Sequence, residues 1–456
     1  MAANTNGTGA TYFDSMDKLG KTHWHFLIIA TIAYFFDQMD MGMFSYVAPA
    51  IMADLGFDQA HLATISSMSF WGMCFGGLIA GWMGERFGRK NGLLAIISIF
   101  SLAQFANIFT QNIYLFCFFR FLVGFGAVGM LVIAMTYISE MMPSQKRGKY
   151  QALTIAIGSA GLPICSLFAT VIIPMGNHTW RYVFLLGALG IFLVPVGMKL
   201  LKESPRWLVS KGRISEAEAI VSECTGLPCD LSSERERIKK QQQNKMSVIQ
   251  AIKIMFDRRY LRTTWVVMLL AVGITVGNFF LASWNTVYQL ELGWDYQAAL
   301  FVSFLIVFGN PLGDLLASMI SDKGGRRIPI ALCCIVGGIG YFLAGQLMEH
   351  YHMPFTVVML IRGMCVAASM TMLWTYCAES FPTAVRSNVS GIILSFARGL
   401  TAFVTPIVPI IYAAIGVGGI YTVNSLMFII PAVFVLMFGK STAGKTLEEI
   451  EEEAMG

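Results

Sequence analysis

Two carboxylates lie three residues apart within a hydrophobic stretch near the start of the chain. The stretch runs from about residue 24 to residue 51 and contains Phe36-Asp37-Gln38-Met39-Asp40-Met41-Gly42. It is long enough to cross a bilayer as a helix, and the spacing places Asp37 and Asp40 on one face of that helix. A carboxylate at mid-membrane depth costs at least ~2.5 kcal/mol, so it is normally retained where it meets water, a substrate or a cation. We therefore predict that this pair binds protons.

Three arginines also lie within hydrophobic stretches. Arg120 is the predicted cationic partner of the two acids, and a static ion pair that only fixes helix packing is the alternative. Arg398 lies in the middle of Ser395-Phe396-Ala397-Arg398-Gly399, where its guanidinium could bind a substrate carboxylate through two parallel hydrogen bonds. The alternative for Arg398 is a pairing with a neighbouring helix. We expect Arg362 to be structural.

Further polar and aromatic side chains are weaker candidates for contact with a substrate. Amides and a hydroxyl in the spans could donate hydrogen bonds, and two aromatic rings could stack on a substrate ring. Packing inside the bundle is the alternative for all of them. The candidates are Asn278, Asn310, Ser159, Trp374 and Tyr376.

Sequence motifs for nucleotide binding, catalysis and metal binding are not found. The Gly324-Gly325 pair and the later glycine run at 337–340 follow no strand, so they are no dinucleotide fingerprint. A catalytic triad or a histidine metal site cannot be assembled from the six histidines. We therefore expect no enzyme activity, no cofactor and no metal.

The composition is that of a membrane protein with many spans. Hydrophobic residues make up 56% of the 456 residues and charged residues only 13%, whereas a soluble protein carries about 25% charged residues. Seven of the nine cysteines lie in apolar runs, where cysteine acts as a small hydrophobic residue rather than as part of a disulfide framework. The polar N-terminal residues and the full-length first span argue against a cleavable signal peptide.

Twelve apolar stretches predict an all-α membrane protein with twelve transmembrane helices. They fall into two groups of six, separated by a polar linker. The predicted spans are 24–51, 61–83, 91–109, 113–138, 150–174 and 180–201, then 263–282, 296–320, 328–347, 353–376, 388–414 and 418–438. The predicted domains are a disordered tail (1–22), a six-helix bundle (23–202), a linker with short helices (203–260), a second bundle (261–439) and an acidic tail (440–456).

The positions of the basic residues predict the orientation in the membrane. Of the 32 lysines and arginines, 28 lie on one side of the spans, one (Arg181) lies on the other side and three lie within spans. Because basic loops stay in the cytoplasm, both termini and the linker are predicted to be cytoplasmic. The net charge of +5 is therefore explained by the basic cytoplasmic loops that set the orientation, and we expect no nucleic-acid partner. In the linker, Ser215 to Glu218 and Ser233 to Glu236 match helix-capping boxes.

The two halves of the chain repeat each other. Gly84-Glu85-Arg86-Phe87-Gly88-Arg89-Lys90 after the second span is echoed 237 residues later by Ser321-Asp322-Lys323-Gly324-Gly325-Arg326-Arg327. Glu140-Met141-Met142-Pro143 after the fourth span is echoed 239 residues later by Glu379-Ser380-Phe381-Pro382. Such repeats place a binding site at the membrane midplane between two halves that rock against each other.

These motifs resemble those of the major facilitator superfamily over residues 24–438. The most specific is the turn from Gly81 to Lys90, in which Glu85 replaces the usual Asp. Arg120-Phe-Leu-Val-Gly124 resembles the family's fourth-span signature, and Lys202-Glu203-Ser204-Pro205-Arg206-Trp207 resembles the motif that ends the first half in the sugar-porter-like branch. The resemblance implies that the first and fourth spans border a central cavity.

The first span resembles that of aromatic-acid/proton symporters and nicotinate-type transporters. Their Asp-Gly-x-Asp pattern is present here with Gln38 in place of Gly. True sugar porters would carry a Gln in the fifth span where this chain has Ser159, so a hexose substrate is disfavoured. Arg398 is the repeat-related mate of that position. The resemblance also implies a conformational latch of charged residues at the cytoplasmic ends: Glu85, Arg86, Arg89, Glu140, Arg147, Asp322, Arg326, Glu379 and Arg386.

The sequence thus predicts a monomeric, proton-coupled symporter for a small organic acid, with aromatic acids among the candidates. Asp37 and Asp40 would hold the coupling proton, Arg120 would tune it and Arg398 would hold the substrate carboxylate. A sugar, polyol or organic-cation carrier of the same fold is an alternative within the class. A non-transporting sensor is an alternative from another class, although a long signalling tail is missing.

Overall fold

The computed structural model describes residues 13–14, 19–143, 145–231, 248–320, 326–381 and 385–439. Most of the predicted tail at 1–22, the second capping box at Ser233 and the acidic tail at 440–456 lie outside these residues. Asp322 and the side chain of Arg386 also lie outside them. What was predicted for these parts of the chain stays a prediction.

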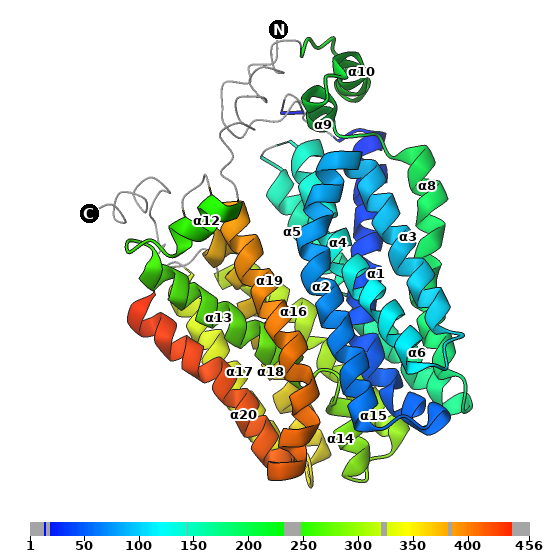
Figure 1. The fold of residues 1–456 in the computed structure, drawn as a ribbon, viewed down its shortest axis with the longest axis vertical. Helices are drawn as coiled ribbons and strands as arrows, with labels where there is room; N and C mark the ends of the chain where they lie inside the picture. Colours follow the sequence, from blue (N-terminus) through cyan, green and yellow to red (C-terminus); the bar gives the residue numbers. More distant parts are fainter. Residues whose placement is uncertain are drawn as a thin grey trace.

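Six helical passes form the N-terminal half of the molecule (Figure 1). Single long helices make the first four passes, and shorter helices joined in line make the fifth and sixth. The passes are α1 (Lys21–Leu55), α2 (Gln59–Phe87), α3 (Arg89–Asn107), α4 (Ile113–Met141), α5 with α6 and the 3-10 turn η1 (Arg147–Gly158, Gly161–Ile172, Ile173–Met175), and α7 with η2 and α8 (Trp180–Ala188, Leu189–Phe192, Leu193–Leu200).

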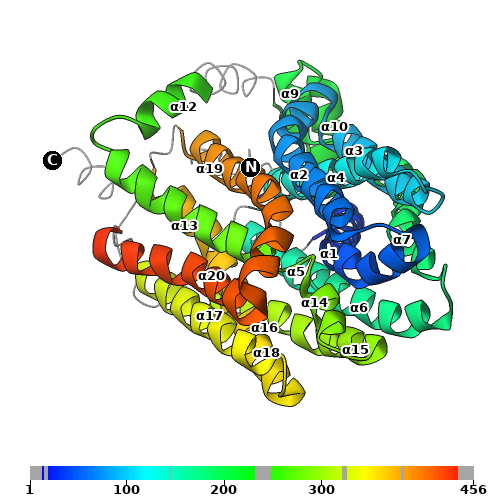
Figure 2. The same cartoon turned by 60° about the horizontal axis from the view of Figure 1, so that its bottom comes forward.

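The C-terminal half lies beside the first in both ribbon views (Figures 1 and 2). Its helices are α13 (Leu261–Phe280) followed by α14 (Asn285–Glu291), α15 (Tyr296–Val307) with α16 (Gly309–Ile320), α17 (Arg327–Leu347), α18 (His352–Glu379), α19 (Arg386–Val404) with η3 (Thr405–Ile407), and α20 (Val408–Phe438). The polar linker contributes α9 (Pro205–Ser210), α10 (Ile214–Thr225) and α12 (Val248–Met255).

The described helices account for the twelve predicted spans. Ten segments are long and apolar enough to cross a membrane, and one of them, Asn388–Phe438, has 51 residues, which is enough for two crossings. Gly416, with a φ of 66°, kinks that segment within α20. The remaining crossing is α3, a 19-residue helix that packs against α4 and α7. The prediction of an all-helical fold with two bundles is confirmed.

Glycines let α2 and α4 approach each other closely. A Cβ atom on Gly72 would lie 2.0 Å from the backbone oxygen of Phe121, and one on Gly124 would lie 2.0 Å from that of Ser69. Any larger residue at either position would push the two helices apart. This close contact holds Ser69 of α2 beside Arg120 of α4.

One helix in the linker begins differently from the prediction. The capping-box prediction made Ser215 the N-cap of a helix, but α10 already begins at Ile214, with Arg213 as its N-cap residue. Ser215 therefore lies in the first turn of the helix, and this prediction was wrong. The Arg213 guanidinium pairs instead with Glu216 at 2.6 Å. Ser204 is the side chain that caps α9, where its hydroxyl accepts a hydrogen bond from Trp207 N at 3.3 Å.

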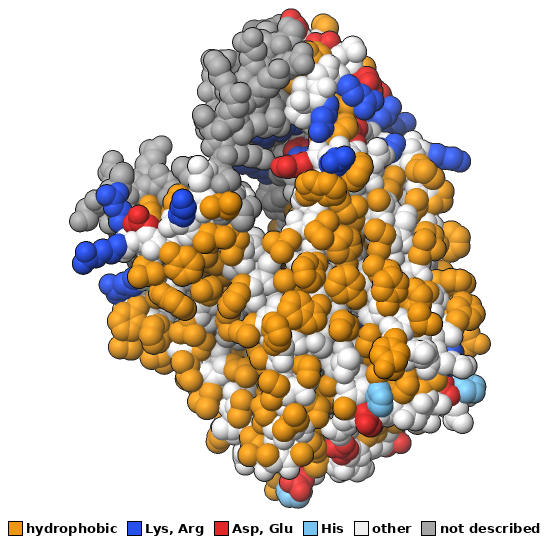
Figure 3. Space-filling view, in the orientation of Figure 1, with side chains coloured by type: hydrophobic (Ala, Val, Ile, Leu, Met, Phe, Trp, Pro, Cys, Tyr) orange, Lys and Arg blue, Asp and Glu red, His pale blue; other side chains and the backbone are white. Residues whose placement is uncertain are grey.

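Charged side chains gather at the two ends of the molecule (Figure 3). Lysines and arginines surround α9, α10 and α12 at one end, which we call the basic end. Hydrophobic side chains cover the middle of this face, and acidic and histidine side chains lie at the other end, which we call the far end. A belt of this kind is the surface that a bilayer requires.

Contacts between the two halves concentrate toward the far end. Tyr296 OH donates to the backbone oxygen of Tyr46 at 2.7 Å, and Gln59 Nε2 lies 2.5 Å from Glu291 Oε1. Deeper in the bundle, Ser67 of α2 donates to the backbone oxygen of Ala402 in α19 at 2.6 Å. In Figure 1 the helices of the two halves diverge toward the basic end.

Candidate functional site

An ion pair between Asp40 and Arg120 lies buried inside the N-terminal half. Arg120 Nη1 is 2.8 Å from Asp40 Oδ1, and the side chains are only 3% and 1% exposed. Ser69 Oγ accepts a hydrogen bond from Arg120 Nε at 3.0 Å, and Gln104 Nε2 donates to Asp40 Oδ1 at 2.7 Å. Four helices therefore contribute to this arrangement: α1 and α4 carry Asp40 and Arg120, and α2 and α3 carry the hydrogen-bond partners Ser69 and Gln104. The structure thus brings together two residues that the sequence paired.

A pocket between the two halves opens onto this pair. From the N-terminal half it is lined by residues of α1, α2 and α4, and from the C-terminal half by residues at and just after the end of α13. Most of the lining is apolar or aromatic, and Asp40 and Arg120 supply its charges. The lining residues are Asp40, Met41, Phe44, Ser66, Ser69, Phe70, Met73, Arg120, Phe279, Ala282 and Ser283.

Arg398 faces Asp37 across the interface between the halves. Asp37 is 2% exposed and Arg398 is 8% exposed, and their opposite charges attract each other across the interface without forming an ion pair or hydrogen bond in this conformation. Arg398 Nη1 donates to Met73 Sδ at 3.2 Å, and its Cζ lies 5.8 Å from the centre of the Phe279 ring. Because Met73 and Phe279 both line the pocket, Arg398 lies directly behind the pocket wall.

The two carboxylates of α1 therefore interact with two guanidinium groups in different ways, since only Asp40 forms an ion pair with its arginine. Asp40 is paired with Arg120 inside its own half, whereas Asp37 faces Arg398 of the opposite half. The i, i+3 spacing predicted that both acids share one face of α1. In the structure the partners of that face are Arg120 and Arg398. A movement of one half against the other would change the distance between Asp37 and Arg398, while the Asp40–Arg120 pair would move as one body.

The other candidate ligands lie outside this pocket. Ser159 follows α5, is 1% exposed and donates to the backbone oxygen of Ala156 at 3.0 Å. Asn278 precedes the pocket residue Phe279, and Asn310 lies at the start of α16.

The two aromatic candidates on α18 do not line the pocket either. Trp374 is 40% exposed. Tyr376 is 1% exposed and lies one turn before the end of α18, where a Cβ atom on Gly439 would lie 3.0 Å from its hydroxyl group. Tyr376 therefore lies at the basic end, with its hydroxyl group beside the end of α20.

Several residues of the site were missed at the sequence level. The pocket aromatics Phe44, Phe70 and Phe279 carry no signal that separates them from the chain's other aromatic residues. Gln104, which donates to Asp40, carried a usable signal, because it is a polar side chain within an apolar span. Asp314 carries the same signal but does not line the described pocket. Asp314 of α16 accepts a hydrogen bond from Thr371 Oγ1 at 2.6 Å.

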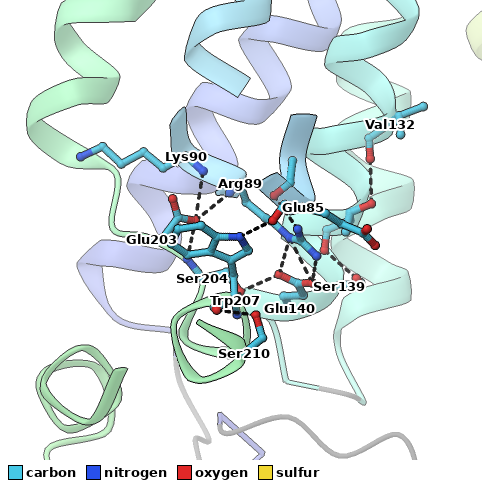
Figure 4. A network of polar contacts seen from close by, with 12 residues as sticks. Glu85, Arg89, Lys90, Val132, Ser139, Glu140, Glu203, Ser204, Trp207 and Ser210 are labelled. Atoms are coloured by element: carbon cyan, nitrogen blue, oxygen red, sulfur yellow. Dashed lines mark hydrogen bonds and ion pairs between the residues drawn. The ribbon is translucent and has the colours of Figure 1, made fainter. Parts of the chain in front are cut away.

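A polar network at the basic end connects the motif residues of the N-terminal half (Figure 4). Arg89 Nη2 pairs with Glu140 Oε1 at 2.9 Å, and Ser204 Oγ donates to Glu140 Oε2 at 2.6 Å. Trp207 Nε1 donates to the backbone oxygen of Glu85 at 2.9 Å. The linker motif is thereby attached to the ends of α2, α3 and α4.

Two ion pairs among the described residues of the predicted latch each lie within one half. Arg89 pairs with Glu140 in the N-terminal half, and Arg326 pairs with Glu379 at 3.0 Å in the C-terminal half. Arg86 lies over the ring of Trp82, with 5.4 Å from its Cζ to the ring centre, and Arg147 is the first residue of α5. In this conformation the charged pairs brace each half. A latch between the halves stays a prediction for a different conformation.

Glu203 completes the network by capping α3 from the linker. Its Oε1 accepts hydrogen bonds from the backbone N–H groups of Arg89 at 2.8 Å and Lys90 at 3.2 Å. A Cβ atom on Gly88 would lie 2.2 Å from Glu203 Oε2, so this approach requires glycine, which also adopts a φ of 98° here. Burial raises the pKa of the Glu203 carboxyl group above its ordinary value, while hydrogen bonds from Ser204, Lys90 and Arg89 oppose the rise.

The pKa of Glu203 predicts how stability changes with pH in a Glu203→Gln variant. Because the folded-state pKa lies above the unfolded one, the contribution of Glu203 is fully present below the unfolded pKa and is lost as the pH rises through the folded pKa. Glutamine has no such loss and keeps an acceptor oxygen. We therefore expect thermal unfolding in detergent to show the variant gaining stability relative to the wild type as the pH rises above about pH 4. A difference that is constant with pH would contradict this expectation.

The part of the chain that the structure describes contains no group of three or more His, Cys, Asp or Glu side chains placed to hold a metal ion. The pocket itself offers the Asp40 carboxylate, the Arg120 guanidinium group and aromatic rings, which can serve charge pairing, proton binding and ring stacking.

Comparison with protein families gives a match over most of the chain. Residues 30–406 match the family model described as Major Facilitator Superfamily. YyaJ of Bacillus subtilis, which is named for metabolite transport, is 30% identical over 445 residues, covering 95% of this chain and 96% of that protein. The niacin transporter NiaP of Acinetobacter baylyi is 26% identical over 443 residues, covering 95% and 97%. The 4-hydroxybenzoate transporter PcaK of Pseudomonas aeruginosa is 26% identical over 377 residues, covering 82% and 83%.

Solved structures resemble the whole described fold. A partially occluded inward-open structure of the xylose transporter XylE from E. coli superposes with a TM-score of 0.77 and covers 94% of this chain and 100% of that one. The sequences are 20% identical, so this likeness concerns the arrangement of the helices.

Proposed function

This chain belongs to the major facilitator superfamily and is a membrane transporter rather than an enzyme, and from this premise we propose that it takes up a small aromatic acid together with protons. The observation that carries the proposal is the pocket between the halves. It combines aromatic walls with the Asp40–Arg120 pair and has Arg398 directly behind the wall.

The pocket has the chemistry that an aromatic monocarboxylate requires. Phe44, Phe70 and Phe279 offer apolar surfaces for a flat ring. The guanidinium group of Arg398, behind the pocket wall, can bind a carboxylate through two parallel hydrogen bonds. Niacin and 4-hydroxybenzoate, after which two relatives are named, both carry one carboxylate on a six-membered aromatic ring. Because Gln38 replaces the Gly of the first-span pattern, we propose the class of substrate and not one of these two acids.

In the proposed cycle, the substrate carboxylate acts on the attraction between Asp37 and Arg398, and the proton acts on the Asp40–Arg120 pair. The substrate carboxylate binds Arg398 in competition with Asp37, which frees the N-terminal half from its attraction to the C-terminal half. A proton taken up by Asp40 removes the negative charge from the buried pair and leaves Arg120 free to bind other acceptors. Release of the proton on the other side restores the pair and resets the carrier.

The orientation in the membrane follows from the basic end. We propose that this end, with both termini and the linker, lies in the cytoplasm, because lysine and arginine accumulate on the cytoplasmic side of membrane proteins. The contacts between Tyr296 and Tyr46 and between Gln59 and Glu291 would then close the outer side. The structure would accordingly represent the state that faces the cytoplasm.

Uptake into proteoliposomes tests the proposal. Purified protein would be offered radiolabelled benzoate, 4-hydroxybenzoate and nicotinate, with benzylamine as a matched cation and xylose as a neutral solute. We expect at least one of the acids to accumulate when the outside is acidic, and a protonophore to abolish that accumulation. Benzylamine uptake without acid uptake would favour the organic-cation alternative, and acid accumulation that ignores the proton gradient would rule out proton coupling.

A further inference from the structure

Buried polar side chains form a row on α3, which supplies none of the residues that line the described pocket. Ser101, Gln104 and Asn107 follow one another at intervals of three residues, so they share one face of the helix. Their side chains are 1%, 0% and 0% exposed. Consecutive members are separated by about 4.5 Å along the helix axis, a gap that one water molecule can bridge.

Polar atoms of this row lack hydrogen-bond partners among the residues that the structure describes. In the row, these atoms are Gln104 Oε1 and both side-chain polar atoms of Asn107. The second carboxylate oxygen of the neighbouring Asp40, Oδ2, also lacks a partner among the described residues. Gln104 also connects the row to Asp40, because its Nε2 donates to Asp40 Oδ1. Buried polar atoms that remain unpaired cost roughly 1–3 kcal/mol each, and in folded proteins ordered water commonly satisfies them.

The row ends beside charged groups at the far end. Asn107 is the last residue of α3, and the backbone oxygen of the next residue, Ile108, accepts a hydrogen bond from Arg181 Nη1. Arg181 Nη2 lies 3.5 Å from Asp54 Oδ2, and Asp54 Oδ1 lies 2.8 Å from Nδ1 of His178. The His178 side chain is 74% exposed, so this cluster is in contact with water.

We propose that water molecules held by Asn107 and Gln104 form a proton relay from the Asp54–His178 cluster to Asp40. The proposal rests on the proposed function, since it requires Asp40 to bind the coupling proton. A hydronium ion at the cluster would give up one proton, each water would pass one on, and the Asp40 carboxylate would receive one. The two amides accept and donate hydrogen bonds and stay neutral throughout.

The relay explains how a proton from outside can reach Asp40 while the outer side of the pocket is closed. The charged and titratable groups that face Asp40 are Asp37 on its own helix, Arg120 of α4 and the Cys165 thiol of α6. Arg120 lines the pocket, which the contacts between the halves close at the far end, and Asp37 lies one turn from Asp40 on α1. The α3 row reaches Asp40 from within the N-terminal half, so protonation from outside would not have to wait for the halves to move.

An Asn107→Leu variant tests the relay, because leucine has a similar volume and cannot hold a water molecule. In proteoliposomes with labelled 4-hydroxybenzoate and nicotinate, we expect uptake driven by an inward proton gradient to fall about tenfold or more. Counterflow of the same acids at equal pH needs no net proton transfer, so it should stay within about twofold of the wild type. Asn107→Ser, which can hold water, should restore part of the gradient-driven uptake.

Ser101→Ala is the matched control, because Ser101 is a buried and unpaired member of the same row on the other side of Gln104. It should leave both assays unchanged. Equal losses of uptake and counterflow in Asn107→Leu, or a loss in neither assay, would overturn the relay.

A measurement without substrate separates failure of the relay from failure of the proposed function. A drop in pH outside vesicles on a solid-supported membrane should give a transient proton-binding current, which Asp40→Asn abolishes and Asn107→Leu slows. Equal rates in Asn107→Leu and the wild type would overturn the relay alone. A wild type without any transient would overturn Asp40 as the proton site, and the relay with it. A transient without uptake of either acid would overturn only the proposed substrate class.

Discussion

Replacing Arg398 with alanine is expected to lower kcat/KM for acid uptake by about 100-fold, which corresponds to ~2.7 kcal/mol. Arg398 is 8% exposed, and its guanidinium group is attracted by Asp37 and lies against Met73 and Phe279 of the pocket wall. A substrate carboxylate that replaces Asp37 would lose its charged partner in the variant. The measurement is the initial rate of uptake over a range of substrate concentrations, with the amount of protein in the membrane determined in parallel.

Two further variants show whether the loss belongs to substrate binding. Arg398→Lys keeps the charge without the planar fork, so an intermediate loss of about tenfold is expected. Arg362→Ala is the control, since Arg362 also lies within a span but hydrogen-bonds to Tyr341 Oη at 2.9 Å, between α17 and α18. It should leave KM unchanged even if the protein becomes less stable. Uptake by Arg398→Ala with the KM of the wild type would refute the assignment.

Replacing Asp40 with asparagine is expected to abolish accumulation of the acid against its gradient. The variant has no carboxylate to take up the proton, and Arg120 is left as a buried cation that has lost its partner at 2.8 Å. Removing one member of a buried ion pair costs ~3–5 kcal/mol of stability, so the variant should also unfold at a lower temperature. Accumulation ratios with and without a proton gradient, together with thermal unfolding in detergent, measure the two effects.

The double variant Asp40→Asn, Arg120→Gln separates the two effects. It removes both charges and should recover most of the lost stability, because no unpaired ion remains in the apolar interior. Accumulation should nevertheless stay absent, since the proton site is gone. If the double variant accumulates the acid again, the pair is purely structural and another group must carry the proton.

The sequence predicted the helices better than it predicted the pocket. Each apolar stretch is long enough to be recognised by itself, because a lipid-exposed backbone must satisfy its own hydrogen bonds. The Asp40–Arg120 pair could also be predicted from the sequence, since isolated charges in apolar spans have few possible partners. The start of α10 was not predicted correctly, since the capping pattern indicates Ser215 as the N-cap residue whereas the structure has Arg213 there, paired with Glu216.

The aromatic wall of the pocket could not be predicted from the chain. Phe44, Phe70 and Phe279 come from three helices of the two halves, and their rings meet only after the halves have docked. Tyr376 illustrates the same limit, because its place in a late span did not indicate that it lies at the basic end and not in the described pocket. The row on α3 became visible only when its unpaired atoms could be placed beside Asp40.

By itself, the sequence determined that this protein crosses a membrane with two similar helical bundles and carries charges inside them. Those properties follow from local energetics, namely the cost of exposing apolar residues to water and of burying single charges in lipid. Only the tertiary structure decided which charges meet. Asp37 faces Arg398 and Asp40 binds Arg120 because helix packing brings residues together that lie far apart in the chain. Such pairings depend on the geometry of docked helices, which no local pattern encodes.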